Sequence, residues 1–142
     1  MTSQNSIPSS SPWIDRGLLV VRIALGVVFL MHGGQKLFVY GHAGVTAAMA
    51  SLGLPFPGLN AYLITAAELG GGLALLFGAL TRPAAAVLAF SMVVAIVSVH
   101  LRAGFFAPAG FEYPLTLLLG NLALLMTGGG KYAFDAKMRA RT

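Results

Sequence analysis

The sequence has 142 residues, of which 57% are hydrophobic and only 9% are charged. A soluble domain carries about a quarter charged residues, and so short a chain cannot bury this much apolar surface in water. The absence of cysteine excludes disulfides, iron–sulfur ligation and a thiol nucleophile from this chain. The formal net charge of +5 is too small and too dispersed to indicate a nucleic-acid partner. We therefore expect a membrane protein, with the lipid bilayer as its first partner.

The chain begins with a polar segment that is rich in serine. A secretory signal peptide would need a basic stretch before the first apolar run and a small-residue cleavage site, and neither is present. We therefore expect residues 1–15 to form a polar N-terminal tail, and the first hydrophobic segment to stay in the mature protein.

Four apolar segments follow, and a membrane-spanning helix needs roughly 20 such residues. Their boundaries are about 17–37, 61–80, 83–101 and 111–127, the last being the shortest. Only Thr81 and Arg82 separate the second segment from the third, and Pro83 suits the first turn of a helix, so these two segments should form a tight antiparallel hairpin. The sequence thus predicts an all-α fold, with a bundle of four transmembrane helices in residues 16–130.

The remaining segments indicate how the bundle is oriented. The run from Val45 to Leu52 is too short to cross a bilayer, and it predicts a short interfacial helix between the first and second spans. The glycines at 128–130 end the fourth helix, and a basic tail follows over residues 131–142. If both termini lie on one side, seven of the nine Lys and Arg residues lie there, and only Lys36 and Arg102 lie opposite. Because basic residues favour the cytoplasmic side, we expect both termini in the cytoplasm of a bacterium, with the protein in the inner membrane.

Polar residues inside the apolar segments need a structural or chemical reason, because an ionisable group in hydrocarbon costs several kcal/mol. Glu68 lies about 12 Å inside the second segment, too deep for its short side chain to reach water. It is either protonated or paired, and its possible partners at similar depth are His32, Lys36 and His100. For Glu68, an ion pair that only stabilises the fold is as good an explanation as a chemical role.

The first segment carries a stripe that mixes charged and small residues on one helical face. Either this stripe faces other helices, or its charged members extend along the helix to water at the two interfaces. In the second segment, small residues four apart predict close packing between helices. The stripe consists of Asp15, Arg22, Gly26, Phe29, Gly33 and Lys36 with His32 beside it, and the small residues are Gly70, Ala74 and Gly78.

Six polar residues of the presumed outer half are the candidate site residues. As catalytic residues we predict Glu68, His32 and His100, which could exchange protons with a bound quinone. As residues that hold a quinone we predict Lys36, Arg102 and Glu112. Histidines on two helices could also ligate a haem, but we favour proton transfer, and no metal-ligand spacing is present.

The ordered set of short motifs resembles the DoxX family of small four-helix membrane proteins over about residues 16–136. Phe134 stands where a serine is frequent in the family. The resemblance implies an inner-membrane protein and, loosely, a membrane partner of oxidoreductases, because the family is named after a subunit linked to thiosulfate:quinone oxidoreduction. The motifs are Arg22–Gly26, His32–Leu37, Leu52–Pro55, Glu68–Gly72, Arg82–Ala85, Met92, Ala95, His100, Gly104–Phe106, Glu112–Pro114 and Gly130–Asp135.

Two functions from different classes follow. The first is a membrane subunit of a quinone-linked oxidoreductase complex, whose partners are other membrane subunits or a soluble oxidoreductase. The second is a structural accessory subunit of a respiratory or electron-transfer complex without chemistry of its own, for which the glycine-rich second helix offers a packing face. A transporter is a third reading, and it would need a homo-oligomer because four helices are few for one chain.

Overall fold

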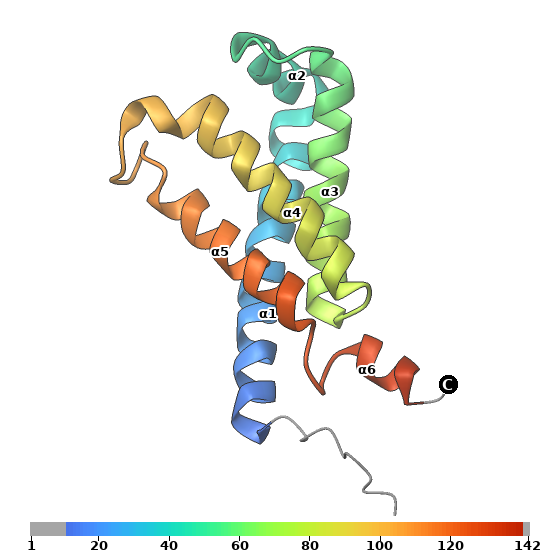
Figure 1. Cartoon of the computed structure of the whole chain (residues 1–142). Coiled ribbons are helices and arrows are strands. Elements are labelled where there is room, and N and C mark those ends of the chain that lie inside the picture. The colour runs from blue at the N-terminus through green and yellow to red at the C-terminus, as the bar shows by residue number, and fades with distance from the viewer. Residues whose placement is uncertain (1–10, 141–142) are drawn as a thin grey trace, which may run out of the picture.

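A computed structural model describes residues 11–140, and every regular element in this range is helical (Figure 1). The all-α prediction is therefore confirmed, while expectations for residues 1–10 and for Arg141 lie outside the described residues. The elements are α1 (Pro12–Gly34), the π-helical η1 (Gln35–Tyr40), α2 (Gly41–Ser51), α3 (Pro57–Phe77), α4 (Thr81–Ala95), the π-helical η2 (Ile96–His100), the short 3-10 helix η3 (Leu101–Ala103), α5 (Glu112–Thr127) and α6 (Phe134–Arg139).

The helix starts follow local chemistry. Pro12 and Pro57 open α1 and α3, where a missing N–H costs no helical hydrogen bond. Helix α1 therefore begins inside the segment predicted as a polar tail. Gly41 has a φ of 64°, which is open to glycine and strained for other residues, and it separates η1 from α2. The short helix expected between the first two spans corresponds to α2, and the basic tail contains α6.

Four long helices pack around one core. Helix α1 packs on α3, α3 packs on α4, and α4 packs on α5. Helix α5 in turn contacts α1. In Figure 1, α1 and α3 run side by side, and the pair α4 and α5 crosses them obliquely. The core is apolar and draws on all four helices: Leu25, Phe29, Leu75, Ala85, Leu88, Met92, Leu117 and Leu124.

Glycines set the close contact between α1 and α3. A Cβ on Gly72 would lie 2.7 Å from the Leu30 backbone nitrogen, and one on Gly26 would lie 3.0 Å from the Gly72 carbonyl oxygen. The prediction that Gly70 takes part in this contact was wrong, because no neighbouring helix lies close to Gly70. The helix is rotated so that Gly72 faces α1, and this rotation follows from the fit of the two helices.

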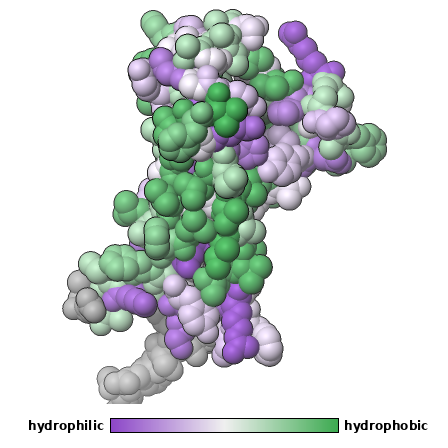
Figure 2. Space-filling view, turned by 180° about the vertical axis from the view of Figure 1, so that it is seen from behind, coloured by the Kyte–Doolittle hydropathy of each residue, from purple (hydrophilic) through white to green (hydrophobic). Residues whose placement is uncertain are grey.

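The outer surface is suited to lipid. Figure 2 shows hydrophilic side chains gathered at the two ends of the molecule, with a mostly hydrophobic belt between them. Large apolar side chains such as Phe38, Phe90 and Met126 are exposed in the described part. By length and composition, two of the described helices could cross a membrane, Pro57–Phe77 and Thr81–Ala103.

Candidate functional site

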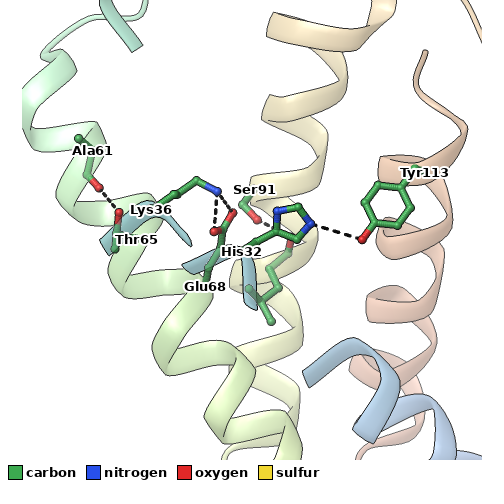
Figure 3. A network of polar contacts seen from close by, with 8 residues as sticks. His32, Lys36, Ala61, Thr65, Glu68, Ser91 and Tyr113 are labelled. Atoms are coloured by element: carbon green, nitrogen blue, oxygen red, sulfur yellow. Dashed lines mark hydrogen bonds and ion pairs between the residues drawn. The ribbon is translucent and has the colours of Figure 1, made fainter. Parts of the chain in front are cut away.

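An ion pair between buried Glu68 and half-buried Lys36 joins α3 to the end of the first helix. Glu68 is only 4% exposed, and its two carboxylate oxygens accept hydrogen bonds from the Lys36 ammonium at 2.9 and 2.7 Å (Figure 3). Of the three partners that the sequence left open, the fold selects Lys36. Lys36 is the second residue of the π-helical η1. Removing one member would leave the other charge uncompensated, so the pair is sensitive to single substitutions.

A second polar contact lies beside this pair. His32 is one helical turn before Lys36, and its Nε2 lies 3.5 Å from the Tyr113 hydroxyl of α5, at the limit of a hydrogen bond. In Figure 3 the imidazole projects between the ion pair and Tyr113. Side chains from α1, η1, α3 and α5 therefore meet in one region. Tyr113 was not among the predicted candidates, although its position beside Glu112 could have indicated it.

The other three candidates lie in or beside the connection between α4 and α5: His100 ends η2, Arg102 lies in η3, and Glu112 is the first residue of α5. His100 donates its Nδ1 hydrogen to the Ala109 carbonyl at 2.7 Å, and a Glu112 oxygen accepts the Ala107 amide at 2.8 Å. Both side chains therefore fasten this connection, and Arg102 is exposed on η3. The fold thus groups Glu68, Lys36 and His32 and gives His100 and Glu112 backbone partners. Within residues 11–140, no three His, Asp or Glu side chains are placed to hold a metal ion.

An apolar hollow of about 640 Å³ borders His32. It lies along one side of the first helix and its π-helical extension, and His32 and Gln35 are its polar members. Such a surface accepts a hydrocarbon chain and offers hydrogen bonds only at its polar members. Its apolar and glycine members are Leu30, Met31, Gly34, Phe38 and Val39.

The opposite end of the molecule holds a second polar assembly. Arg22 is 2% exposed, and its guanidinium donates to the Gly129 carbonyl at 3.3 Å and to the Tyr132 carbonyl at 3.4 Å. The buried Asp15 accepts the Lys131 amide at 2.9 Å. The charged stripe of α1 therefore faces inward at this end, and the alternative that Arg22 extends to water is wrong. These bonds hold the segment after α5 against α1.

Asp135 fastens the same segment to α4. Its two carboxylate oxygens accept the Leu80 and Thr81 amides at 2.8 Å each, so it caps the first turn of α4 from a distant part of the chain. Burial by itself would raise the pKa of Asp135, but the backbone hydrogen bonds from Thr81 and Leu80 and the charge of Arg139 outweigh it and lower the pKa below its ordinary value. The carboxylate is therefore charged at neutral pH.

Similarity to known proteins identifies the family of this chain. The profile of the DoxX family matches residues 17–101. The chain is 37% identical to the "Putative oxidoreductase CatD" of Bacillus subtilis (strain 168) over 119 residues, which cover 84% of each chain. It is also 37% identical to the inner membrane protein YqjF of Escherichia coli (strain K12) over 122 residues, covering 85% of this chain and 91% of the other.

A third relative is the "Uncharacterized membrane protein Rv3486" of Mycobacterium tuberculosis (strain ATCC 25618 / H37Rv), which is 34% identical over 135 residues, covering 87% of this chain and 82% of that one. No solved structure matches. The family profile spans more than half of the chain and includes the residues of the Glu68 site on α1, η1 and α3. This chain is therefore a membrane protein of the DoxX family.

Proposed function

We propose that the protein is a membrane subunit of a quinone-linked oxidoreductase complex, and that Glu68, Lys36 and His32 form its quinone site. The observation that carries this proposal is the ion pair of buried Glu68 with half-buried Lys36, beside a histidine that borders an apolar hollow. The oxidoreductase name of CatD and the inner-membrane name of YqjF, both close in sequence to this chain, support the setting.

The proposed topology has four membrane spans with both termini in the cytoplasm. Helices α3 and α4 have the length and hydropathy for it. Helix α1 has 23 residues and continues into η1, whereas α5 has only 16, or about 24 Å of helix. Because α5 packs beside α4 and its outward residues are apolar, we place it across the bilayer as well, with some local thinning of the lipid.

The residues of the site have complementary tasks. A quinone, when bound, is reduced to quinol by two electrons and two protons, and the electrons would come from a partner redox subunit because this chain contains no cysteine to ligate a cluster. The His32 ring can donate a hydrogen bond or a proton to one quinone oxygen. The Lys36 ammonium can supply a second proton, and Glu68 holds that ammonium in place by accepting two hydrogen bonds. The apolar hollow beside His32 suits the hydrocarbon tail.

A second candidate function is a non-catalytic accessory subunit. One specific observation favours it: Lys36 and Glu68 form an ion pair within the fold, so each charge has a partner without a ligand. In this reading the pair fastens η1 to α3, and its loss would weaken assembly without touching any chemistry.

A set of charge variants separates the two functions. The tagged protein is purified in mild detergent from its native membrane, its co-purifying subunits are identified by mass spectrometry, and quinone reduction by the complex is measured. Glu68→Gln leaves Lys36 unpaired, and we expect it to lower both stability and turnover. The double variant Glu68→Gln/Lys36→Met removes both charges, so we expect stability to recover while turnover stays lost.

The matched control is Glu112→Gln, a carboxylate that binds a loop amide outside the Glu68 cluster, and it should keep turnover. Recovery of turnover in the double variant would establish the accessory role instead. Wild-type turnover in Glu68→Gln, or a protein that purifies without any redox subunit, would overturn the quinone-site proposal.

A further inference from the structure

Helix α6 presents an apolar edge at the end of the molecule where α1 begins. In Figure 1 it runs across the axis of α1, which is the orientation of a helix that lies in a membrane surface. Phe134 and Met138 are four residues apart, so they share one face of α6, and they are 52% and 50% exposed. The α3–α4 turn, to which Asp135 binds, adds the mostly exposed Phe77 and Leu80.

The exposed charge around this edge is positive. Lys131 and Lys137 are exposed on the same segment, and Arg82 is exposed at the start of α4. The two acids of this end are already engaged, because Asp15 accepts the Lys131 amide and Asp135 accepts two amides at the start of α4. Cations beside an apolar edge match a lipid with a negative headgroup and buried chains.

The segment is also held in place before any ligand arrives. The Asp135 amide donates to the Gly78 carbonyl at 3.0 Å, in addition to the bonds that its carboxylate accepts. Arg22 binds the Gly129 and Tyr132 carbonyls from the other side. A surface that is already ordered loses little conformational entropy when it binds.

We propose that α6 and the α3–α4 turn form a binding surface for an anionic phospholipid, independent of the quinone site. Phe134 and Met138 enter the upper acyl region, and Lys131 and Lys137 contact the phosphate headgroup. The anionic lipid thereby keeps the α6 end at a fixed depth in the membrane surface. An acidic protein partner would use the same charges but would leave the apolar edge in water.

The test measures the depth of α6 and its lipid preference in the full-length protein. Because the chain contains no cysteine, Met138→Cys provides a unique position for a nitroxide label in nanodiscs. The nanodiscs contain either phosphatidylcholine alone or a mixture with phosphatidylglycerol of the same chains. Depth is read from the collision of the label with oxygen, which dissolves in lipid, and with a water-soluble nickel chelate. Lipid affinity is measured on the unlabelled protein by native mass spectrometry.

We expect the label to be protected from the nickel chelate, and more so with phosphatidylglycerol. Each cation near an anionic surface favours binding by about fivefold, so Lys131→Gln/Lys137→Gln should weaken binding of phosphatidylglycerol by up to about 25-fold. The Lys131 amide that holds Asp15 is unchanged by this substitution, so the fold should persist, as circular dichroism would verify. Arg102→Gln, at the far end, is the matched control and should keep the preference.

Two results would overturn the proposal. One is a label at position 138 that collides with the nickel chelate equally often in both lipids. That result would indicate a surface that faces water and a soluble partner. The other is an unchanged preference for phosphatidylglycerol in Lys131→Gln/Lys137→Gln. Neither result depends on quinone turnover, so failure here leaves the Glu68 site untouched.

Discussion

Asp135 offers the sharpest test of how the C-terminal segment stabilises the fold. Its carboxylate accepts the amides of Leu80, which precedes α4, and of Thr81, which begins it, and the Thr81 bond is part-buried, so water cannot fully replace it. Losing a helix cap costs about 0.5–2 kcal/mol, and hydrogen bonds to a charged group lie at the upper end of the usual range. We therefore expect Asp135→Ala to lower the free energy of unfolding by about 2 kcal/mol. Asp135→Asn keeps one acceptor and should cost about half as much.

The pH dependence of this effect has a definite sign. The pKa of Asp135 is lowered in the folded state, so its contribution is complete above the ordinary carboxyl value of about 4 and is lost as the pH falls through the folded pKa. The difference between wild type and Asp135→Ala should thus be constant from pH 7 to about pH 5 and shrink below about pH 4.

The measurement is unfolding in detergent followed by circular dichroism, at a fixed scan rate and a series of pH values. Lys137→Gln is the control, because it lies on the same helix and caps nothing among the described contacts. An Asp135→Ala variant as stable as wild type at pH 7, or a deficit that does not change down to pH 3, would refute the capping role.

Two further predictions concern packing and the Arg22 contacts. Gly72→Leu should separate α1 from α3 and destabilise the protein by about 1–3 kcal/mol or more, since a Cβ there meets the Leu30 backbone, whereas Gly70→Ala should be neutral or slightly stabilising; equal thermal stability of the two variants would contradict this packing. Arg22→Met should release the segment after α5, and trypsin should then cleave at Lys131 several-fold faster than in wild type. An unchanged cleavage rate would show that Arg22 does not hold this segment.

Several features of this protein could be predicted from its sequence because they depend on one helix at a time. Helical periodicity placed Asp15, Arg22 and Gly33 on one face of the first helix, and the structure buries all three. Depth along the second segment showed that Glu68 needs a partner. The DoxX motifs indicated the family, which the family profile confirmed.

Other features depended on contacts between distant segments. Lys36 of η1, and not His32 or His100, pairs with Glu68 of α3. His100 and Glu112 were grouped with Glu68 by depth alone, but each binds a backbone group in the α4–α5 connection.

The sequence by itself determined the helical class, the inward face of α1 and the need for a partner at Glu68. Only the tertiary structure decided which partner it has, which glycines let α1 and α3 touch, and that Arg22 reaches a carbonyl 107 residues away. The physical reason is that periodicity fixes the faces of one helix but not its rotation and shift against its neighbours. Those are set by the fit of side chains from all the helices together.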